Sequence, residues 1–251
     1  LGCAYLNFTA SHDGIGMRPA EGILPPEEAE KMIDGVRRFG GEVSMRTLPG
    51  GGEAPYELNI TWFDAMAGSF DGPDDWHMAR FLCSQTIIMA LEGIPAFYIH
   101  ALLATPNDHE GVAKTGIKRA INRHRWDYPA LLERLADPES AQSRVLNGLK
   151  ARVRTRCRQP AFHPNATQFT LHLDPRIFGI WRQSLDRDQS IFALHNVSRD
   201  EIAVPPLSIN LIGGETWVDL LSGEAIAPSG DDIVMRPYQC RWITNRARVR
   251  K

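Results

Sequence analysis

Apolar and polar positions follow two different rhythms along this chain. Up to about residue 160, short apolar runs alternate with stretches of helical periodicity. Beyond the Pro-rich junction at 158–165, short strand-like runs such as 169–173 and 233–235 are separated by Gly, Pro, Asn and Asp. We therefore expect an α/β domain over residues 1–160, followed by a small antiparallel β-sandwich over residues 161–251.

The first region begins with a strand, a loop and a helix. The run 3–8 is short and apolar, as expected of a buried parallel strand, and 94–99 has the same character. Between them, Pro25-Pro26 begins a helical pattern that ends at Gly40-Gly41, and a second helix is expected to be capped by Asp74 and to stop at Gly93. Strand, helix and strand in this order predict a parallel crossover.

The rest of the first region contains no further parallel strand. Residues 100–127 are polar and are expected to form a long loop of the kind that carries function, followed by helices over 128–136 and 140–156. Two strand–helix units fall well short of a closed eight-stranded barrel, which takes about 250 residues. Because two strands alone leave unpaired edges, we expect association with missing barrel strands or with another copy.

Composition excludes several classes of function. Lys and Arg number 28 against 30 Asp and Glu, and the net charge of -2 offers no basic excess for nucleic acid. The longest apolar stretch, 94–103, contains Pro95 and His100 and is shorter than the roughly 20 residues of a membrane helix. Leu1 in place of an initiator Met indicates a cut or processed start, and no signal peptide follows it. We expect a cytoplasmic protein whose four widely separated cysteines are reduced.

Three polar motifs are the candidates for chemistry. They read Ser11-His12-Asp13-Gly14-Ile15-Gly16, Tyr56-Glu57-Leu58-Asn59-Ile60-Thr61 and Arg119-Ala120-Ile121-Asn122-Arg123-His124. In this order they resemble the C-terminal half of the sucrose-phosphorylase-type sugar phosphorylases, which belong to the α-amylase superfamily. The resemblance spans nearly the whole chain. It implies the last two strand–helix units of a (β/α)8 TIM barrel, with 94–99 as the eighth strand, followed by the β-sandwich.

The resemblance also implies a retaining mechanism, in which an Asp nucleophile forms a glucosyl-enzyme, a Glu acts as acid and base, and inorganic phosphate releases α-glucose 1-phosphate. Asp13 matches a third carboxylate that binds sugar hydroxyls and stabilises the oxocarbenium-like transition state. His12 is expected to bind the same sugar. The nucleophile and the acid/base are implied to lie upstream of Leu1, so the chain alone is expected to be inactive.

The motif at 119–124 and the segment before it supply further candidates. Arg119 matches the family arginine that reaches the glucose subsite, although an ordinary loop ion pair is the alternative. Arg123 and His124 are expected to support it. Asn107 and Asp108 follow the eighth strand and are candidates either for sugar contact or for capping the loop.

The departures from sucrose phosphorylases concern the acceptor. Tyr56-Glu57 stands where those enzymes carry Tyr-Gln, and an ionised Glu57 only accepts hydrogen bonds, which favours hydroxyl donors. Arg18 suits an anionic acceptor, such as the carboxylate of glycerate or a sugar phosphate. Glucosylglycerate phosphorylase therefore ranks above sucrose phosphorylase, ahead of the sucrose 6-phosphate and glucosylglycerol enzymes. The alternative is that Arg18 and Glu57 pair with each other or face solvent.

Two other functions compete with phosphorolysis. The same covalent intermediate supports hydrolysis or transglycosylation when water or a sugar hydroxyl intercepts it. A non-catalytic carbohydrate-binding fragment is the third reading, with Trp181, Trp217 and Trp242 as candidate platforms, although such tryptophans more often fill a core. No metal or organic cofactor is expected, because no Cys/His metal pattern and no nucleotide-binding motif is present. The expected small molecules are a carbohydrate and phosphate.

Overall fold

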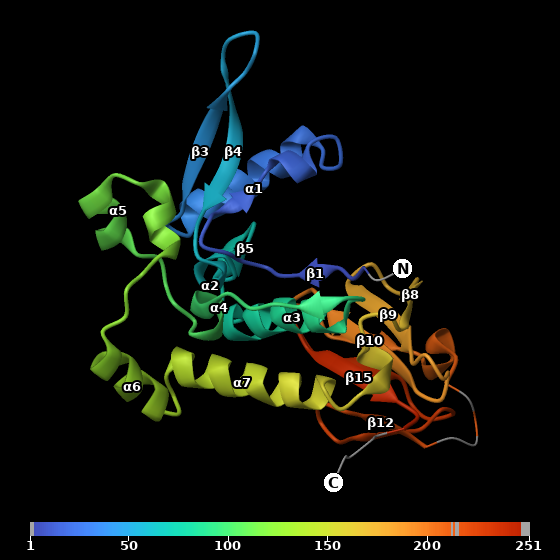
Figure 1. Cartoon of the computed structure of the whole chain (residues 1–251). Coiled ribbons are helices and arrows are strands. Elements are labelled where there is room, and N and C mark those ends of the chain that lie inside the picture. The colour runs from blue at the N-terminus through green and yellow to red at the C-terminus, as the bar shows by residue number, and fades with distance from the viewer. Residues whose placement is uncertain (1–2, 212, 214–215, 247–251) are drawn as a thin grey trace. The chain divides into compact units, whose positions relative to one another are not determined.

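A computed structural model describes residues 3–211, 213 and 216–246 of the chain (Figure 1). The chain forms two compact units, each built from separate stretches. We call residues 1–7, 82–96 and 148–251 the sheet unit, and residues 8–81 and 97–147 the hairpin unit. Helices α3 (His77–Ala90) and α7 (Ala141–Arg156) contribute residues to both. These units are defined by packing and each combines separate stretches of the chain, so they do not test the boundary at residues 160 and 161 that the sequence predicts.

The two strands expected to belong to a barrel lie in the sheet unit and are much shorter than predicted. β1 (Leu6–Asn7) pairs in parallel with β7 (Ile94–Pro95), as the crossover predicted. Their burial was predicted wrongly, since Leu6 is 61% and Ile94 49% exposed. Within the described residues each strand pairs only with the other, so the other edge of each strand has no strand partner there.

A six-stranded antiparallel sheet dominates the sheet unit and confirms the expected all-β region. Its strands, in spatial order, are β13 (Ala225–Ile226), β12 (Trp217–Asp219), β15 (Cys240–Thr244), β10 (Ser190–Asn196), β9 (Ile177–Gln183) and β8 (Thr167–Leu171). β10 and β15 are buried almost throughout because they lie in the middle of the sheet, whereas the edge strand β8 is mostly exposed.

A smaller sheet shares the apolar core of the six-stranded one. β11 (Ile202–Val204) pairs antiparallel with β14 (Ile233–Met235), and residues of both sheets join in a single hydrophobic cluster. Trp217 belongs to that cluster, and the fully buried Trp242 packs edge-on against Phe162 at 4.8 Å between ring centroids. These two tryptophans therefore fill the interior. The 3-10 helices of this unit are η3 (Pro160–Phe162) and η4 (Pro206–Ile209).

Buried polar groups in the sheet unit bind backbone atoms. Arg182, on β9, is fully buried and donates to the carbonyl oxygens of Ala90 at 2.8 Å, His163 at 2.9 Å and Ala166 at 3.3 Å. Burial lowers its pKa to about 10, with the charge of Arg156 acting in the same direction. Arg182 therefore acts as an internal brace, because it donates hydrogen bonds to backbone carbonyl groups that folding has removed from water.

The hairpin unit is organised around a three-stranded antiparallel sheet. β4 (Glu53–Asn59) lies between β2 (Ile15–Gly16) and β3 (Glu42–Thr47). The Gly-rich stretch forms the tight turn between β3 and β4, where Gly51 and Gly52 have φ values of 88° and 86° that glycine adopts without steric cost. The sequence pattern missed β3, because its alternation is short and follows directly on the glycines that end a helix.

Helix α1 (Pro26–Arg38) lies where the sequence placed it and packs on this sheet (Figure 1). Ile33 and Val36 on its buried face join Val43 and Leu58 of the strands in one apolar cluster. The 3.6-residue repeat puts both helical positions on the same side. The cluster anchors the strands that carry the second motif.

The remaining elements of the hairpin unit are short. They are η1 (Arg18–Ala20), α2 (Trp62–Ala65), β5 (Gly68–Ser69), β6 (Gly72–Pro73), α4 (Ile99–Leu102), α5 (His109–Thr115), η2 (Lys118–Asn122) and α6 (Tyr128–Ala136). The expected long loop at 100–127 is therefore partly helical. Asp108 caps α5 by accepting the Gly111 amide at 2.7 Å, and Gly116 ends it in the left-handed conformation.

Candidate functional site

The first two motifs lie side by side in the hairpin unit. Strand β2 places Ile15 opposite Leu58 and Gly16 opposite Glu57, and the Met17 amide donates to the Tyr56 carbonyl at 2.9 Å. Antiparallel pairing thus brings together segments separated by about forty residues in the chain. The segment after the His-Asp motif therefore lies along the strand that carries the Tyr-Glu motif.

Gly14 allows the two segments to approach closely. Its amide donates to Glu57 Oε1 at 3.1 Å. A Cβ at this position would stand 2.4 Å from the Leu58 carbonyl oxygen and 2.7 Å from Glu57 Cγ, closer than real Cβ contacts come. A glycine is therefore needed here for space.

Arg119 links the third motif to the other two. Its Nη1 lies 2.9 Å from Asp13 Oδ1, while Nε and Nη2 lie 2.9 and 2.5 Å from the two oxygens of Glu57. One guanidinium therefore bridges two carboxylates and binds Glu57 in a bidentate manner. The structure brings together three residues that the sequence predicted separately.

Asp13 has two arginines and a histidine beside it but remains reachable. Arg123 Nη2 lies 3.4 Å and His12 Nε2 3.6 Å from its Oδ1, and the Asn122 amide donates to the Asp13 carbonyl at 3.2 Å. The side chain is 36% exposed. Among the described residues every ion-pair contact goes to Oδ1, so Oδ2 is available to accept from a hydroxyl group.

Glu57 occupies the opposite environment. Its side chain is only 5% exposed and accepts from Asn59 Nδ2 at 2.5 Å as well as from Gly14 and Arg119. Burial raises the pKa of Glu57, but hydrogen bonds from Arg119, the Gly14 amide and Asn59 outweigh it, so the pKa lies below its usual value. Glu57 is therefore a fixed anion. It pairs with Arg119, and not with Arg18.

Three residues of this site escaped the sequence analysis as individual candidates. Asn59 orients Glu57, Asn122 binds the Asp13 carbonyl, and Tyr98 donates its hydroxyl to the Asn122 carbonyl at 2.7 Å. Burial raises the pKa of Tyr98, so its hydroxyl stays a donor. Asn59 and Asn122 lie inside the second and third motifs, and that position was the sequence signal that could have identified them.

The other candidates for ligand contact are exposed. Arg18, on η1, has no carboxylate within ion-pair distance among the residues that the structure describes. Tyr56 is 40% exposed, and the His12 side chain 68%. All three can therefore meet a ligand that approaches from solvent.

Asn107 serves the fold of the hairpin unit. Its Oδ1 accepts the Thr61 amide at 2.9 Å, and its Nδ2 donates to the Phe39 carbonyl at 3.0 Å. Its own amide donates to Asp64 at 2.7 Å. With both side-chain atoms bound to backbone, Asn107 fits the capping alternative and not sugar contact.

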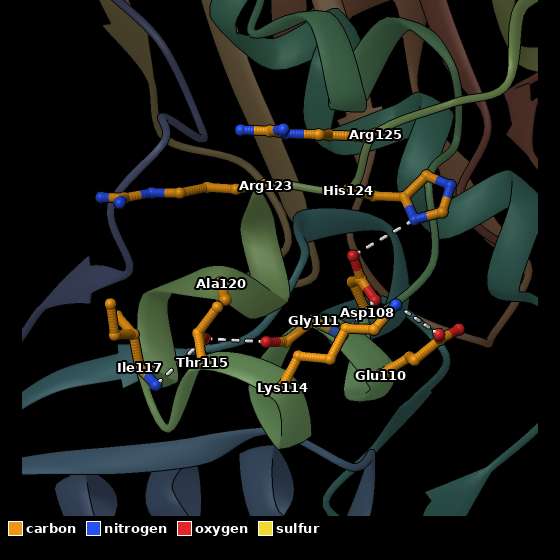
Figure 2. A pocket seen from close by; sticks show the side chains of 10 residues that line it. All are labelled: Asp108, Glu110, Gly111, Lys114, Thr115, Ile117, Ala120, Arg123, His124 and Arg125. Carbon is orange, nitrogen blue, oxygen red and sulfur yellow. Dashed lines mark hydrogen bonds and ion pairs between the residues drawn. The ribbon is translucent and has the colours of Figure 1, made fainter.

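Asp108 lines a pocket of about 570 Å³ (Figure 2). Figure 2 shows its carboxylate facing His124, with Oδ2 3.3 Å from Nδ1, while Arg123 extends away from them. The residues that line this pocket include neither Asp13 nor Glu57. Of the residues around Asp13, only Arg123 is among the described lining residues. The carboxylate oxygen without a partner among the described residues therefore lies at Asp13 and not in this pocket.

The described residues give no sign of a metal site or of a membrane span. No group of three or more His, Cys, Asp or Glu in the described ranges is arranged to hold a metal ion. None of the described helices combines the length and apolar character needed to cross a bilayer. The four cysteines are free thiols.

Comparison with known proteins gives a consistent picture. No family model matches the chain. Glucosylglycerate phosphorylase from Spirochaeta thermophila is 38% identical over 250 residues, which are 96% of this chain and 42% of that protein. Sucrose phosphorylase from Agrobacterium vitis is 30% identical over 164 residues, or 61% of this chain and 30% of that protein.

A solved structure shares the fold. The crystal structure of sucrose 6F-phosphate phosphorylase from Thermoanaerobacter thermosaccharolyticum matches 76% of this chain and 36% of that one with a TM-score of 0.63 and 22% identity. The chain spans about two fifths of the length of its glucosylglycerate phosphorylase relative. It is therefore a relative of the sucrose-phosphorylase-type sugar phosphorylases and corresponds to part of such a protein.

Proposed function

We propose that this chain is part of a retaining α-glucoside phosphorylase and supplies one wall of its glucose site. The observation that carries the proposal is the Asp13–Arg119–Glu57 cluster, in which a carboxylate that is 36% exposed has one oxygen without a hydrogen bond or ion pair to any described residue. By resemblance, the chain corresponds to the last two strand–helix units of a (β/α)8 barrel and the β-sandwich after it. The barrel assignment rests on the parallel β1–β7 pair and on the relatives.

In the proposed reaction, the glycosidic bond of the donor breaks and the anomeric carbon bonds to an Asp nucleophile while a Glu protonates the departing oxygen. A phosphate oxygen then attacks the anomeric carbon, the bond to the Asp breaks, the Glu takes the proton that the phosphate gives up, and α-glucose 1-phosphate forms. Both catalytic residues are assigned by resemblance to residues outside this chain. The 251 residues by themselves are accordingly expected to give no turnover.

Asp13 has the stabilising role in this scheme. Positive charge develops on the sugar ring in the transition state, and a fixed carboxylate favours that charge while accepting from ring hydroxyls. Arg119 and Arg123 hold Oδ1 and leave Oδ2 for the sugar. His12 lies beside the same carboxylate and is proposed to bind a further hydroxyl.

The acceptor is proposed to be an anion such as glycerate. Arg18 is exposed and follows a strand that pairs with β4, so its guanidinium is free to bind a carboxylate near Tyr56. The higher identity to a glucosylglycerate phosphorylase than to a sucrose phosphorylase supports the same order. Asp108 is proposed as a contributor from the neighbouring pocket.

The test uses the longest native polypeptide that contains this chain. Glucosylglycerate and sucrose are offered with and without inorganic phosphate, and glucose 1-phosphate and free glucose are measured. We expect phosphate-dependent glucose 1-phosphate, formed faster from glucosylglycerate. Glucose release independent of phosphate would indicate hydrolysis, and sugar binding without turnover would indicate a binding protein. Equal or faster use of sucrose would overturn the assignment of the acceptor.

A further inference from the structure

Glu57 has no capacity left for a substrate. Five hydrogen bonds reach its two oxygens: one from the Gly14 amide, one from Asn59 and three from Arg119. A carboxylate offers about four lone-pair sites. The side chain is also 5% exposed, against 37% for Arg119. Glu57 therefore faces the protein, although its place in the second motif made it a candidate for acceptor contact.

The geometry points to Glu57 as a positioning residue that acts through Arg119 on Asp13, an inference that rests on the proposed function. Its two oxygens bind Nε and Nη2, one whole edge of the guanidinium, and leave Nη1 directed at Asp13. A bidentate pair fixes both the distance and the rotation of a planar guanidinium. Asn59 in turn is held by the Ser44 hydroxyl, 2.6 Å from its Oδ1, so Glu57 is oriented from behind.

The charges in this cluster make the position of Arg119 depend on Glu57. Asp13 and Glu57 contribute two negative charges, and Arg119 and Arg123 two positive ones. Without the charge of Glu57, Arg119 is free to rotate and to bind both oxygens of Asp13. Oδ2 would then be lost to the sugar. A positioning role thus predicts damage to every glucosyl transfer, whereas acceptor contact predicts damage only where the acceptor is recognised.

The experiment compares wild type with Glu57→Gln in the longest native polypeptide, using glucosylglycerate, sucrose and α-glucosyl fluoride as donors. Glutamine keeps the size and loses the charge. We expect kcat/KM to fall roughly 10- to 100-fold, by the same factor for all three donors. Losses of this size are common when a residue that orients a functional group is changed. The matched control is Glu53→Gln, an exposed glutamate on the same strand, which should change kcat/KM less than twofold.

Two results would overturn the inference. One is a loss confined to glucosylglycerate with the fluoride unaffected, which would make Glu57 an acceptor contact. The other is unchanged kinetics with every donor. Ser44→Ala, which removes only the distal hydroxyl, should reproduce a smaller loss of the same donor-independent kind.

Failure of the proposed function would be seen separately, as a wild-type protein that forms no glucose 1-phosphate from any donor. In that case, the energetic coupling between Glu57 and Arg119 is measured by calorimetric titration with glucose, using Glu57→Gln, Arg119→Lys and the double variant. Because one residue acts through the other, the double variant should bind no more weakly than the weaker single variant. Additive losses, or no loss of binding in either single variant, would overturn the inference.

Discussion

Two arginines, one in each unit, show how the surroundings of the same kind of side chain decide its role. Arg119 in the hairpin unit is 37% exposed and bridges two carboxylates. Arg182 in the sheet unit is fully buried and contacts only carbonyl oxygens among its hydrogen-bond partners. The first arrangement orients charges beside solvent, where a ligand can reach them. The second satisfies backbone groups inside a core, where no ligand enters.

The surrounding polar groups follow the same division. In the hairpin unit, Asp13 and His12 lie at the exposed end of a cluster whose inner member, Glu57, is buried. In the sheet unit, His195 is fully buried, and its Nδ1 lies 3.0 Å from the Phe178 carbonyl. Changes to the exposed charged side chains of the first region should therefore alter activity at nearly constant stability, and changes to the buried polar side chains of the second should alter stability.

The largest effect is expected at Asp13. In the proposed phosphorylase, Asp13→Asn keeps the shape and removes the charge opposite the developing cation, so kcat should fall about 10² to 10³-fold. The unfolding midpoint should stay close to that of wild type. Glucose 1-phosphate release and urea unfolding measure the two, with Asp34→Asn on the exposed face of α1 as the control. Activity within threefold of wild type would contradict the assigned role.

His195 should make the sheet unit sensitive to acid. Burial lowers the pKa of His195 from 6.5 to about 4, while the Phe178 carbonyl opposes this shift. The unfolded chain binds the proton first, so the stabilisation is complete above about pH 6.5 and is lost as the pH falls toward 4. The loss approaches about 3 kcal/mol.

Urea unfolding followed by the fluorescence of the buried Trp217 and Trp242 measures this slope. His195→Leu should flatten it between pH 6.5 and 4, whatever its effect at neutral pH. The same substitution at the exposed His172 should leave the slope intact. An unchanged slope in the His195 variant would assign the acid sensitivity elsewhere.

Arg182→Met tests the internal brace and should cost about 2 kcal/mol of unfolding free energy. The substitution removes a buried charge, but the carbonyls of Ala90 and Ala166 lose the Arg182 donor and the His163 carbonyl keeps only the Ala166 amide. Arg154→Met, at an exposed position of α7, should stay within about 0.5 kcal/mol of wild type. Equal or greater stability of the Arg182 variant would show that desolvation of its charge outweighs its hydrogen bonds.

The smallest effect, about 1 to 2 kcal/mol, is expected for Gly14→Ala, because the added Cβ overlaps the Leu58 carbonyl and Glu57 Cγ. A modest loss of activity should accompany it as Glu57 is displaced. Gly35→Ala is the control, because nothing lies within 4 Å of its added Cβ in the interior of α1. That change should be neutral or stabilising in thermal unfolding. Equal effects at both glycines would contradict the close approach.

Local patterns predicted the elements with strong signals. Helix α6 covers the expected 128–136, strand β14 covers the expected 233–235, and α1 begins at Pro26 and ends at Arg38, just before the predicted glycines. The errors were made where packing decides. The two strands that were expected to belong to a barrel are two residues long, and each has one neighbour among the described residues. Residues 100–127 gained helices because Asp108 and Gly116 provide caps within a polar stretch.

The chain by itself determined which residues are candidates for chemistry, because His12, Asp13, Glu57 and Arg119 are recognisable by type and motif. Tertiary structure alone decided their partners. Glu57 meets Arg119, 62 positions away, through the register of β2 on β4 and the place of η2. Local periodicity reports which face of an element is buried and carries no information on such distant pairings. The partner that turns Glu57 inward is therefore a property of the fold.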